Sequence, residues 1–293
     1  MVEATLEFYE IGRTELDKHI EKLEANGKKA DKVSVSQALK HIVRDWTEAG
    51  GSYERDEPFQ CLLQTVRTIS SENDETMTKV LLPGSGLGRL GHEIAQLPNF
   101  EVTINEWSMF MNVAYRFLES HGQNKDQESF HPFIDTWSHH ATTADQQRRL
   151  SFPDEPLNSS SVLLVEGDFA TVFDTKPAPQ YDMVVTYFFI DTARNLVAYF
   201  DTIKRLLKPG GHWVNLGPLL YGSAPMVQLS AEEIMGLVEE GLGFEFLDIA
   251  GDECGSLTFP GKAIRGMDAA YGFNDRALTR NAYQAQFWVA KKH

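Results

Sequence analysis

From residue 79 onward, short apolar runs alternate with stretches of helical periodicity, and few architectures accommodate this alternation. Strands joined by helices form mostly parallel sheets, because each crossover helix returns the chain to the same edge. The last two runs have no helical pattern between them, which predicts a final antiparallel pair. We therefore expect an α/β fold with a mostly parallel, seven-stranded sheet and an antiparallel last strand. The expected strands cover residues 79–83, 101–105, 162–166, 183–189, 212–216, 244–249 and 284–290.

Helical periodicity also marks the chain before the first expected strand. Between residues 39 and 46, apolar side chains recur at i, i+3, i+4 and i+7, and a similar pattern covers residues 59–66. A more polar helix is expected over residues 5–24, and an irregular, histidine-rich stretch covers about 121–161. These patterns predict a helical extension or lid over residues 1–70. They also predict one α/β domain over 71–293 with an insert at about 121–161.

A glycine-rich loop follows the first expected strand and opens a helix. Glycine lets the backbone approach a ligand closely, and a helix N-terminus presents free N–H groups. Glu106 lies 20 residues after Gly86, at the end of the second expected strand, where a carboxylate can bind ribose hydroxyls. The alternative is that Glu106 caps the helix that begins near Trp107. The order of these features favours a cofactor that carries a nucleoside. The loop reads Pro83-Gly84-Ser85-Gly86-Leu87-Gly88-Arg89.

Several features favour S-adenosyl-L-methionine over a nicotinamide dinucleotide. Arg89 occupies a position where the dinucleotide fingerprint requires a small residue. After the third expected strand, Asp168 can accept a hydrogen bond from an adenine amino group, and Phe169 can stack on the adenine ring. The turn that begins at Lys208 and the antiparallel final pair resemble features of class I methyltransferases. The sequence therefore predicts a site for S-adenosyl-L-methionine, with S-adenosyl-L-homocysteine as the product.

Several ordered motifs occur between about residue 34 and the C-terminus. They are Arg44-Asp45-Trp46, Glu54-Arg55, Gly84-Ser85-Gly86-Leu87-Gly88-Arg89-Leu90, Asn105-Glu106-Trp107-Ser108, Gly167-Asp168-Phe169, Phe188-Phe189-Ile190-Asp191-Thr192-Ala193 and Asn215-Leu216-Gly217-Pro218-Leu219-Leu220-Tyr221. In these motifs the chain resembles the carnosine N-methyltransferase family, also called N2227-like proteins. The resemblance implies a class I Rossmann-like methyltransferase fold with an N-terminal helical extension that covers the cofactor. It also implies N-methylation of a small molecule or short peptide, with an imidazole-bearing, carnosine-like acceptor.

The resemblance also assigns roles to individual residues. Arg44 would pair with the methionyl carboxylate of the cofactor, and His41 stands where the family has glutamine. For both, the alternative is a solvated helix face. Gly222 stands where a family histidine helps to bind the imidazole dipeptide, which puts carnosine itself in question. The cofactor contacts implied are His41, Arg44, Gly84, Gly86, Glu106, Asp168, Phe169 and Tyr187, and the acceptor contacts implied are Asp191, Tyr221, Gly222 and Tyr283.

Asp191 is the residue expected to carry the chemistry. It follows the fourth expected strand, where open α/β sheets place their ligands. A carboxylate there can orient an N–H nucleophile and stabilise the positive charge that grows on nitrogen during methyl transfer. The alternative is an N-cap for a helix expected to start at Thr192.

Charge and cysteine content bear on partners and compartment. With 27 basic and 42 acidic residues, the net charge is −15, which disfavours nucleic-acid and anionic membrane partners. Cys61 and Cys254 lack partners at metal-ligand spacing, so we expect two ordinary thiols, no metal and a reducing compartment. The expected location is the cytoplasm, with the nucleus as an alternative. The sequence leaves the oligomeric state open, a homodimer included.

Two other functions remain open from the sequence. One is an N- or O-methyltransferase of a specialised metabolite, which would use the changed pocket at Gly222. The other is a catalytically silent partner protein that binds S-adenosyl-L-methionine. A nucleic-acid methyltransferase ranks below both because of the negative charge.

Overall fold

The computed structural model describes residues 6–7, 10–29, 31–70, 76–174, 179–222 and 224–293. The chain divides into two compact units, which are described separately. The first unit comprises residues 1–52, 108–158 and 273–278, and the second comprises residues 53–107, 159–272 and 279–293. Helix α4 (Glu48–Ser70) begins in the first unit and continues into the second. The division of the chain at residue 70 stays a prediction.

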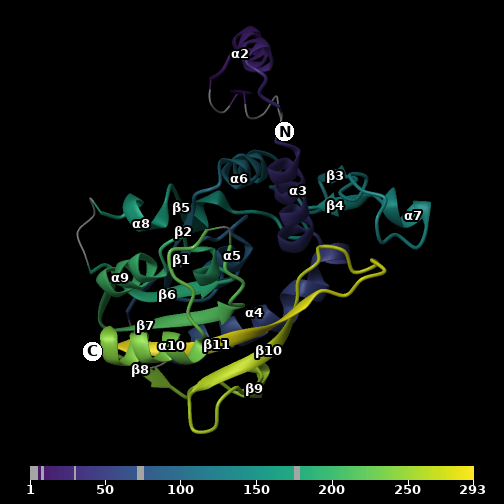
Figure 1. Cartoon of the computed structure of the whole chain (residues 1–293). Coiled ribbons are helices and arrows are strands. Elements are labelled where there is room, and N and C mark those ends of the chain that lie inside the picture. Colours follow the sequence, from purple (N-terminus) through teal and green to yellow (C-terminus); the bar gives the residue numbers. More distant parts are fainter. Residues whose placement is uncertain (1–5, 8–9, 30, 71–75, 175–178, 223) are drawn as a thin grey trace. The chain divides into compact units, whose positions relative to one another are not determined.

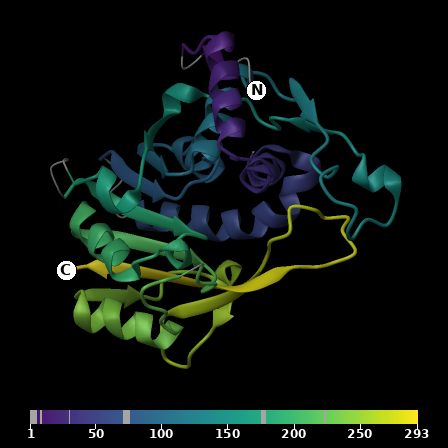
Figure 2. The same ribbon diagram turned by 45° about the horizontal axis from the view of Figure 1, so that its top comes forward.

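Within the described residues, the second unit is built on one nine-stranded sheet (Figure 1). The strand order is β5-β2-β1-β6-β7-β11-β10-β9, and β8 also pairs with β11. Figure 2 shows the same strands from a second direction, with β11 in yellow. The strands are β1 (Thr78–Pro83), β2 (Phe100–Glu106), β5 (Val162–Glu166), β6 (Tyr181–Tyr187), β7 (Leu207–Gly217), β8 (Phe244–Leu247), β9 (Ser256–Leu257), β10 (Ile264–Ala270) and β11 (Ala282–Lys292).

The five strands from β5 to β7 are parallel, and their carboxyl ends lie at one edge of the sheet. The register places Pro83 opposite Asn105, and Glu106 opposite Glu166. It also places Tyr187 opposite Leu216. This alignment brings the segments that follow each strand to a common edge, where open α/β sheets bind ligands.

All seven expected strands are present, and the expected antiparallel pairing of β8 with β11 is confirmed. The α/β fold with a mostly parallel sheet is therefore confirmed. Strands β9 and β10 were not expected from the sequence. Strand β9 is only two residues long, and Gly266 and Asp268 interrupt the apolar pattern of β10. Antiparallel pairing with β11 forms β10 in spite of this weak pattern.

The helices of the second unit bury one face against the sheet. From α9, Phe200 and Ile203 are completely buried, and the Phe200 ring contacts Trp213 of β7 at 5.0 Å between centroids. A capping box of Ser230 and Glu233 begins α10. These helices are α5 (Arg89–Ala95), α8 (Phe169–Val172), α9 (Leu196–Leu206) and α10 (Ala231–Gly236), followed by the π-helical turn η4 (Leu237–Gly241).

The first unit combines helices with a small hairpin. Its expected apolar stripe lies on α3, where Ile42, Val43 and Trp46 are buried. The expectation of one helix over residues 5–24 is wrong in its first part, because residues 10–12 are not helical and α2 begins only at Arg13 after an extended Gly12. The insert contains a hairpin of β3 and β4, so it is less irregular than expected. The elements are α2 (Arg13–Ala25), α3 (Lys32–Trp46), α6 (Met109–His121), β3 (Glu128–Phe130), α7 (Thr143–Gln146) and β4 (Leu150–Phe152).

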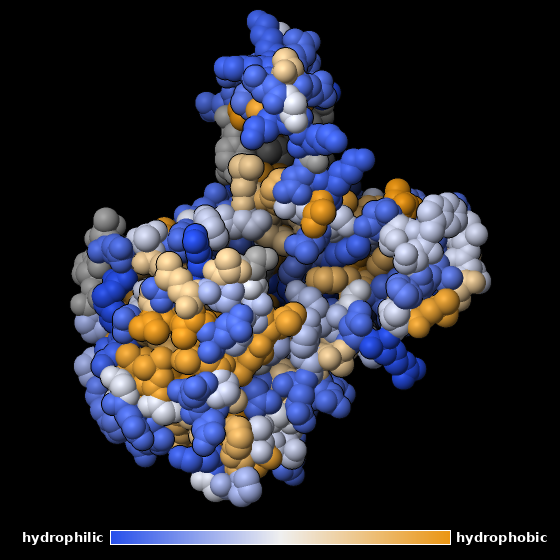
Figure 3. All heavy atoms as spheres, in the orientation of Figure 1, coloured by the Kyte–Doolittle hydropathy of each residue, from blue (hydrophilic) through white to orange (hydrophobic). Residues whose placement is uncertain are grey.

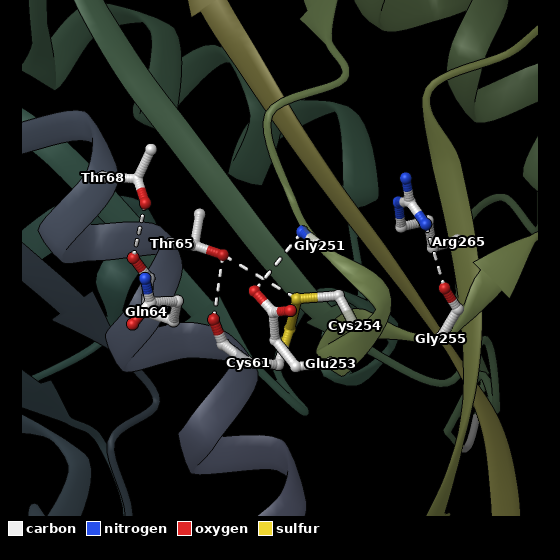
Figure 4. Close-up of a disulfide and its surroundings, with 9 residues drawn as sticks. All are labelled: Cys61, Gln64, Thr65, Thr68, Gly251, Glu253, Cys254, Gly255 and Arg265. Atoms are coloured by element: carbon white, nitrogen blue, oxygen red, sulfur yellow. Dashed lines mark hydrogen bonds between the residues drawn. A yellow bond between two sulfur atoms is a disulfide. The ribbon is translucent and has the colours of Figure 1, made fainter.

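The two cysteines are joined in a disulfide, so the expectation of two ordinary thiols is wrong. Cys61 of α4 and Cys254 of the 3-10 turn η5 (Asp252–Cys254) have Cα atoms 4.9 Å apart, at a sequence separation of 193. Figure 4 shows the bond between the helix and the turn, with the Thr65 hydroxyl 3.8 Å from the Cys254 sulfur. Such a separation leaves no local sequence signal for the pairing.

Polar side chains cover most of the face drawn in Figure 3, in keeping with the acidic composition. Across the part of the chain that the structure describes, no helix has both the length and the apolar character needed to cross a membrane.

Candidate active site

The glycine loop adopts a backbone that other residues rarely reach. Gly84, Gly86 and Gly88 have φ values of 60°, 58° and 74°, all in the left-handed region. A Cβ atom at Gly84 would lie 2.1 Å from the Phe189 ring, so this position also lacks room for a side chain. Position 84 therefore requires glycine for both conformation and space.

Replacing Gly84 by alanine is expected to lower the free energy of unfolding by about 2 kcal/mol or more, through backbone strain and overlap with Phe189. Chemical denaturation of the purified variant measures this loss. Gly222→Ala is the matched control, because a Cβ there meets nothing within 4 Å. Equal stability of the two variants would contradict this account of the loop.

Glu106 binds the glycine loop directly. Its Oε2 atom accepts a hydrogen bond of 2.9 Å from the backbone N–H of Gly86. The N-cap of α6 is Ser108, whose hydroxyl accepts from the N–H of Met111. The alternative that Glu106 caps this helix is therefore wrong. A carboxylate in this place can hold the loop and also accept hydrogen bonds from ribose hydroxyls.

Asp168 and Phe169 follow β5 at the same edge of the sheet. Asp168 Oδ1 accepts from the N–H of Ala170 at 3.0 Å and caps α8. The Phe169 side chain is only 2% exposed, and its ring contacts Phe189 and Tyr199 edge to face. The structure thus places this ring in the core, while Asp168 is partly exposed.

Asn105 was not among the expected site residues, although it stabilises this edge of the sheet. Its side-chain amide donates to the carbonyls of Val165 and Gly167, at 2.8 and 2.9 Å. These two bonds connect the end of β2 to the segment that carries Asp168. The Asn105-Glu106 motif was the available sequence signal.

Asp191 lies in the 3-10 turn η3 (Ile190–Thr192) that follows β6. It is 6% exposed, and its Oδ2 atom accepts from the N–H of Leu220 at 3.1 Å. Burial raises the pKa of this carboxyl to about 6, while the hydrogen bond from Leu220 partly opposes the rise. Helix α9 is capped by Asn195, so the alternative that Asp191 is an N-cap is wrong. A buried carboxyl with a raised pKa is typical of a functional group.

Four aromatic rings form a cluster around Phe188, three residues before Asp191. Phe188, at φ 50°, stacks on Tyr271 with 5.0 Å between centroids and 11° between planes. Tyr283 lies edge to face with Phe188 at 5.9 Å, and Tyr187 does so at 4.9 Å. Tyr271 was missed by the sequence analysis because it follows the unexpected strand β10. Aromatic faces of this kind attract cations.

Tyr221 is bonded to the local backbone, whereas Gly222 has no side chain and is exposed. The Tyr221 hydroxyl donates to the carbonyl of Leu229 and accepts from its N–H, so it closes the local loop. Gly222 is exposed, and a Cβ atom there would have open space around it. Position 222, where the family resemblance implies a histidine, can therefore accept a side chain.

In the first unit, Arg44 and His41 form a cluster of their own on α3. Arg44 is 8% exposed and donates to Asp45 Oδ1 at 2.7 Å and to His41 Nδ1 at 2.9 Å. Burial and the adjacent guanidinium lower the pKa of His41 to about 3, so the ring is neutral. The alternative of a solvated helix face is wrong for Arg44. His41 also contacts the Phe273 ring at 5.1 Å.

Histidines of the insert serve local structure. His131 Nδ1 lies 2.7 Å from the carbonyl of Gln147, and His121 stacks on Phe117. Among the residues that the structure describes, no group of three or more His, Cys, Asp or Glu side chains could hold a metal ion.

The sheet edge fits S-adenosyl-L-methionine in two respects. The glycine cradle of Gly84, Gly86 and Gly88 has the left-handed backbone that suits close approach of a ligand. Glu106 beside this cradle supplies the carboxylate that a ribose diol needs. Asp191 and Phe188 follow β6 at the same edge, where a second ligand can meet the cofactor.

Comparison with known proteins agrees with this geometry. A family model described as carnosine N-methyltransferase matches residues 21–293. The carnosine N-methyltransferase of Mus musculus is 33% identical over 285 residues, covering 92% of this chain and 66% of the mouse protein. The chain thus spans just under two thirds of that relative. The carnosine N-methyltransferase of Schizosaccharomyces pombe is 32% identical over 279 residues, covering 88% of this chain and 70% of the yeast protein.

Among solved structures, a chain from the complex between the Haloferax volcanii Trm112 methyltransferase activator and a methyltransferase has a TM-score of 0.50. It is 13% identical and covers 90% of this chain and 100% of that chain, which shows the fold alone. The expected family is confirmed, because its model matches nearly the whole sequence. The chain belongs to the carnosine N-methyltransferase family.

Proposed function

We propose that this chain is an S-adenosyl-L-methionine-dependent N-methyltransferase whose acceptor is an imidazole-bearing small molecule or short peptide. The observation that carries the proposal is Asp191, a buried carboxyl at the ligand-binding edge of the sheet. Membership in the family supports the choice of reaction and of acceptor class. We propose this activity for the present chain, which spans only part of the length of its mouse relative.

Asp191 would act on the acceptor. Its carboxylate accepts a hydrogen bond from one imidazole N–H and leaves the other ring nitrogen with a free electron pair. S-adenosyl-L-methionine, when bound, supplies a methyl group made electrophilic by its sulfonium. As the N–C bond forms and the C–S bond breaks, the electron pair of the broken bond stays on sulfur. Asp191 stabilises the cationic ring and takes up its proton, which then passes to solvent.

The residues proposed to hold the cofactor lie in the second unit. The backbone at Gly84 and Gly86 would receive it, and Glu106 and Asp168 would accept from its ribose and adenine. Phe169 would contribute mainly through its backbone, since its ring is in the core. For Arg44 and His41, the role at the methionyl carboxylate stays a prediction from the family resemblance. Tyr187 would contact the cofactor at the end of β6.

Gly222→His is expected to raise kcat/KM for carnosine by roughly tenfold, because it restores one hydrogen-bonding partner of the dipeptide in open space. Steady-state kinetics with carnosine and with free histidine measure the change. Gly222→Ala, which adds no polar group, is the control. An equal gain in both variants, or no gain in either, would contradict the assignment of this position to the acceptor.

The test of the proposal is an acceptor panel. Purified protein is incubated with S-adenosyl-L-methionine and, in turn, carnosine, histidine, other imidazoles and amines without an imidazole. We expect S-adenosyl-L-homocysteine to accumulate only with imidazole acceptors. Turnover of another acceptor class alone would favour the methyltransferase of a specialised metabolite. Tight cofactor binding without any turnover would favour a silent binding partner.

The cytoplasm or nucleus is proposed as the compartment, following the acidic, cysteine-poor composition. The disulfide between Cys61 and Cys254 weighs against it, because reducing compartments keep most thiols reduced. Free thiols can be trapped during acid extraction of cells. Peptide mass analysis then shows whether Cys61 and Cys254 are free thiols or a disulfide in the cell.

A further inference from the structure

Glu54 has a buried carboxylate that the proposed reaction does not use. It lies on the part of α4 that belongs to the second unit, and it is 3% exposed. Its Oε1 atom accepts a hydrogen bond of 2.7 Å from the backbone N–H of Gly272, 218 residues later in the chain. Burying a carboxylate is costly unless it is hydrogen-bonded, and a charged acceptor makes a stronger bond than a neutral one. Glu54 therefore holds this backbone amide firmly.

Gly272 lies where the β10–β11 pair has already opened. The ladder ends at the pair Ala270 and Ala282, and the N–H of Tyr271 donates to the carbonyl of Asn281 at 2.9 Å. Beyond these positions the chain leaves the sheet. The bond from Glu54 thus attaches the end of β10 to a helix, next to the residue that carries the Tyr271 ring.

Tyr271 connects this attachment to the candidate acceptor site. Its ring stacks on Phe188 with 5.0 Å between centroids and lies 5.8 Å from the Tyr283 ring. Phe188 lies in the segment that joins β6 to η3, three residues before Asp191. A shift of the backbone at Gly272 would therefore move a ring that stacks on this segment, which leads directly to the proposed acceptor carboxylate.

We propose that Glu54 is a positioning residue for the methyl acceptor: its carboxylate fixes the end of β10 so that Tyr271 stays stacked on Phe188 beside Asp191. This inference rests on the proposed function, which places the acceptor at Asp191. Glu54 touches neither acceptor nor cofactor in this account. It acts on acceptor affinity through Gly272 and Tyr271.

The experiment compares Glu54→Ala with Glu54→Gln, which keeps an oxygen acceptor at the same reach. Glu57→Ala is the matched control, since Glu57 is an exposed carboxylate one turn along the same helix. For Glu54→Ala, we expect the acceptor KM to rise about tenfold or more, as loss of a hydrogen bond to a charged group implies. The KM for S-adenosyl-L-methionine should change less than about twofold, and Glu54→Gln and Glu57→Ala should resemble the wild type.

Amide hydrogen exchange supplies a readout that needs no acceptor. In Glu54→Ala, peptides that contain Gly272 should exchange faster, while peptides from β1 and β6 keep their protection. If the wild type transfers no methyl group, the proposed function fails, and hydrogen exchange still decides whether Glu54 orders this segment. Unchanged exchange at Gly272, or equal rises in both KM values, would overturn the inference.

Tyr271→Leu keeps the experiment decisive if Glu54→Ala does not fold. It removes the ring and leaves the Glu54 bond to Gly272 intact, so the same rise in acceptor KM is expected with normal hydrogen exchange at Gly272. An unchanged acceptor KM in Tyr271→Leu would overturn the inference.

Discussion

Asp191→Asn is expected to lower kcat by about 100-fold or more, because one charged group that stabilises a transition state contributes about a factor of 100 to the rate. The same substitution is expected to raise the stability of the protein. Asparagine keeps an oxygen that can accept from the N–H of Leu220, so the turn itself is preserved. It cannot take up the proton of the acceptor or stabilise a cationic ring as a carboxylate does. The rate therefore falls for an electrostatic reason.

The gain in stability follows from the raised pKa of Asp191. The pKa of this carboxyl is about 6 in the folded protein and 3.8 when the group is exposed, so the folded state binds more protons between these values. The free energy of unfolding falls as the pH rises from 3.8 to about 6 and stays low above it. Because Asp191→Asn removes the charge, the free energy of unfolding should rise by up to about 3 kcal/mol near pH 7.

Two measurements check the prediction on the same samples. Single-turnover methyl transfer gives the rate, and chemical denaturation at pH 5 and pH 8 gives the stability, with the larger gain expected at the higher pH. Asp201→Asn, an exposed carboxylate on α9, is the control and should change neither. In the wild type, the rate should also decline below pH 6, where Asp191 becomes protonated. A variant that keeps its activity would remove Asp191 from the reaction.

Replacing both cysteines, as in Cys61→Ser with Cys254→Ser, is expected to lower the free energy of unfolding by about 5 kcal/mol. The disulfide closes a loop across 193 residues, and a long loop removes much conformational entropy from the unfolded chain. A domain of ordinary stability has only about 5–15 kcal/mol in total, so the melting temperature should drop by about 10 °C or more.

Denaturation of the wild type and the double variant, each with and without a dithiol reductant, measures this contribution. Both sulfur atoms belong to fully buried residues, so we expect reduction to proceed only as the wild type unfolds. The double variant should not respond to the reductant. Equal melting temperatures of the two proteins under oxidising conditions would show that the bond contributes nothing to stability.

Local sequence patterns were sufficient to predict the parallel part of the sheet. Apolar runs bounded by turns predicted β1, β2, β5, β6 and β7, and their common direction predicted the edge at which the site lies. The left-handed glycines and the acid at Glu106 were likewise visible, because spacing within one βα unit fixes where they lie.

Contacts between distant segments could not be predicted from those patterns. The Cys61–Cys254 bond, the Glu54 bond to Gly272 and the Tyr271 stack on Phe188 each join segments whose pairing only the folded chain reveals. The sequence also left two alternatives open for Glu106 and for Asp191, namely capping a helix and binding a ligand. Only the structure shows that Ser108 and Asn195 cap the helices, which excludes that role for Glu106 and Asp191.

Mass analysis of the reaction product tests the central claim most directly. Purified protein is incubated with S-adenosyl-L-methionine that carries a trideuterated methyl group, together with carnosine or histidine as acceptor. We predict that the acceptor gains one trideuteromethyl group in place of a hydrogen, that fragmentation places it on an imidazole nitrogen, and that Asp191→Asn forms far less product. A labelled product whose methyl group lies on oxygen or carbon, or no labelled imidazole under conditions where the cofactor binds, would contradict the account.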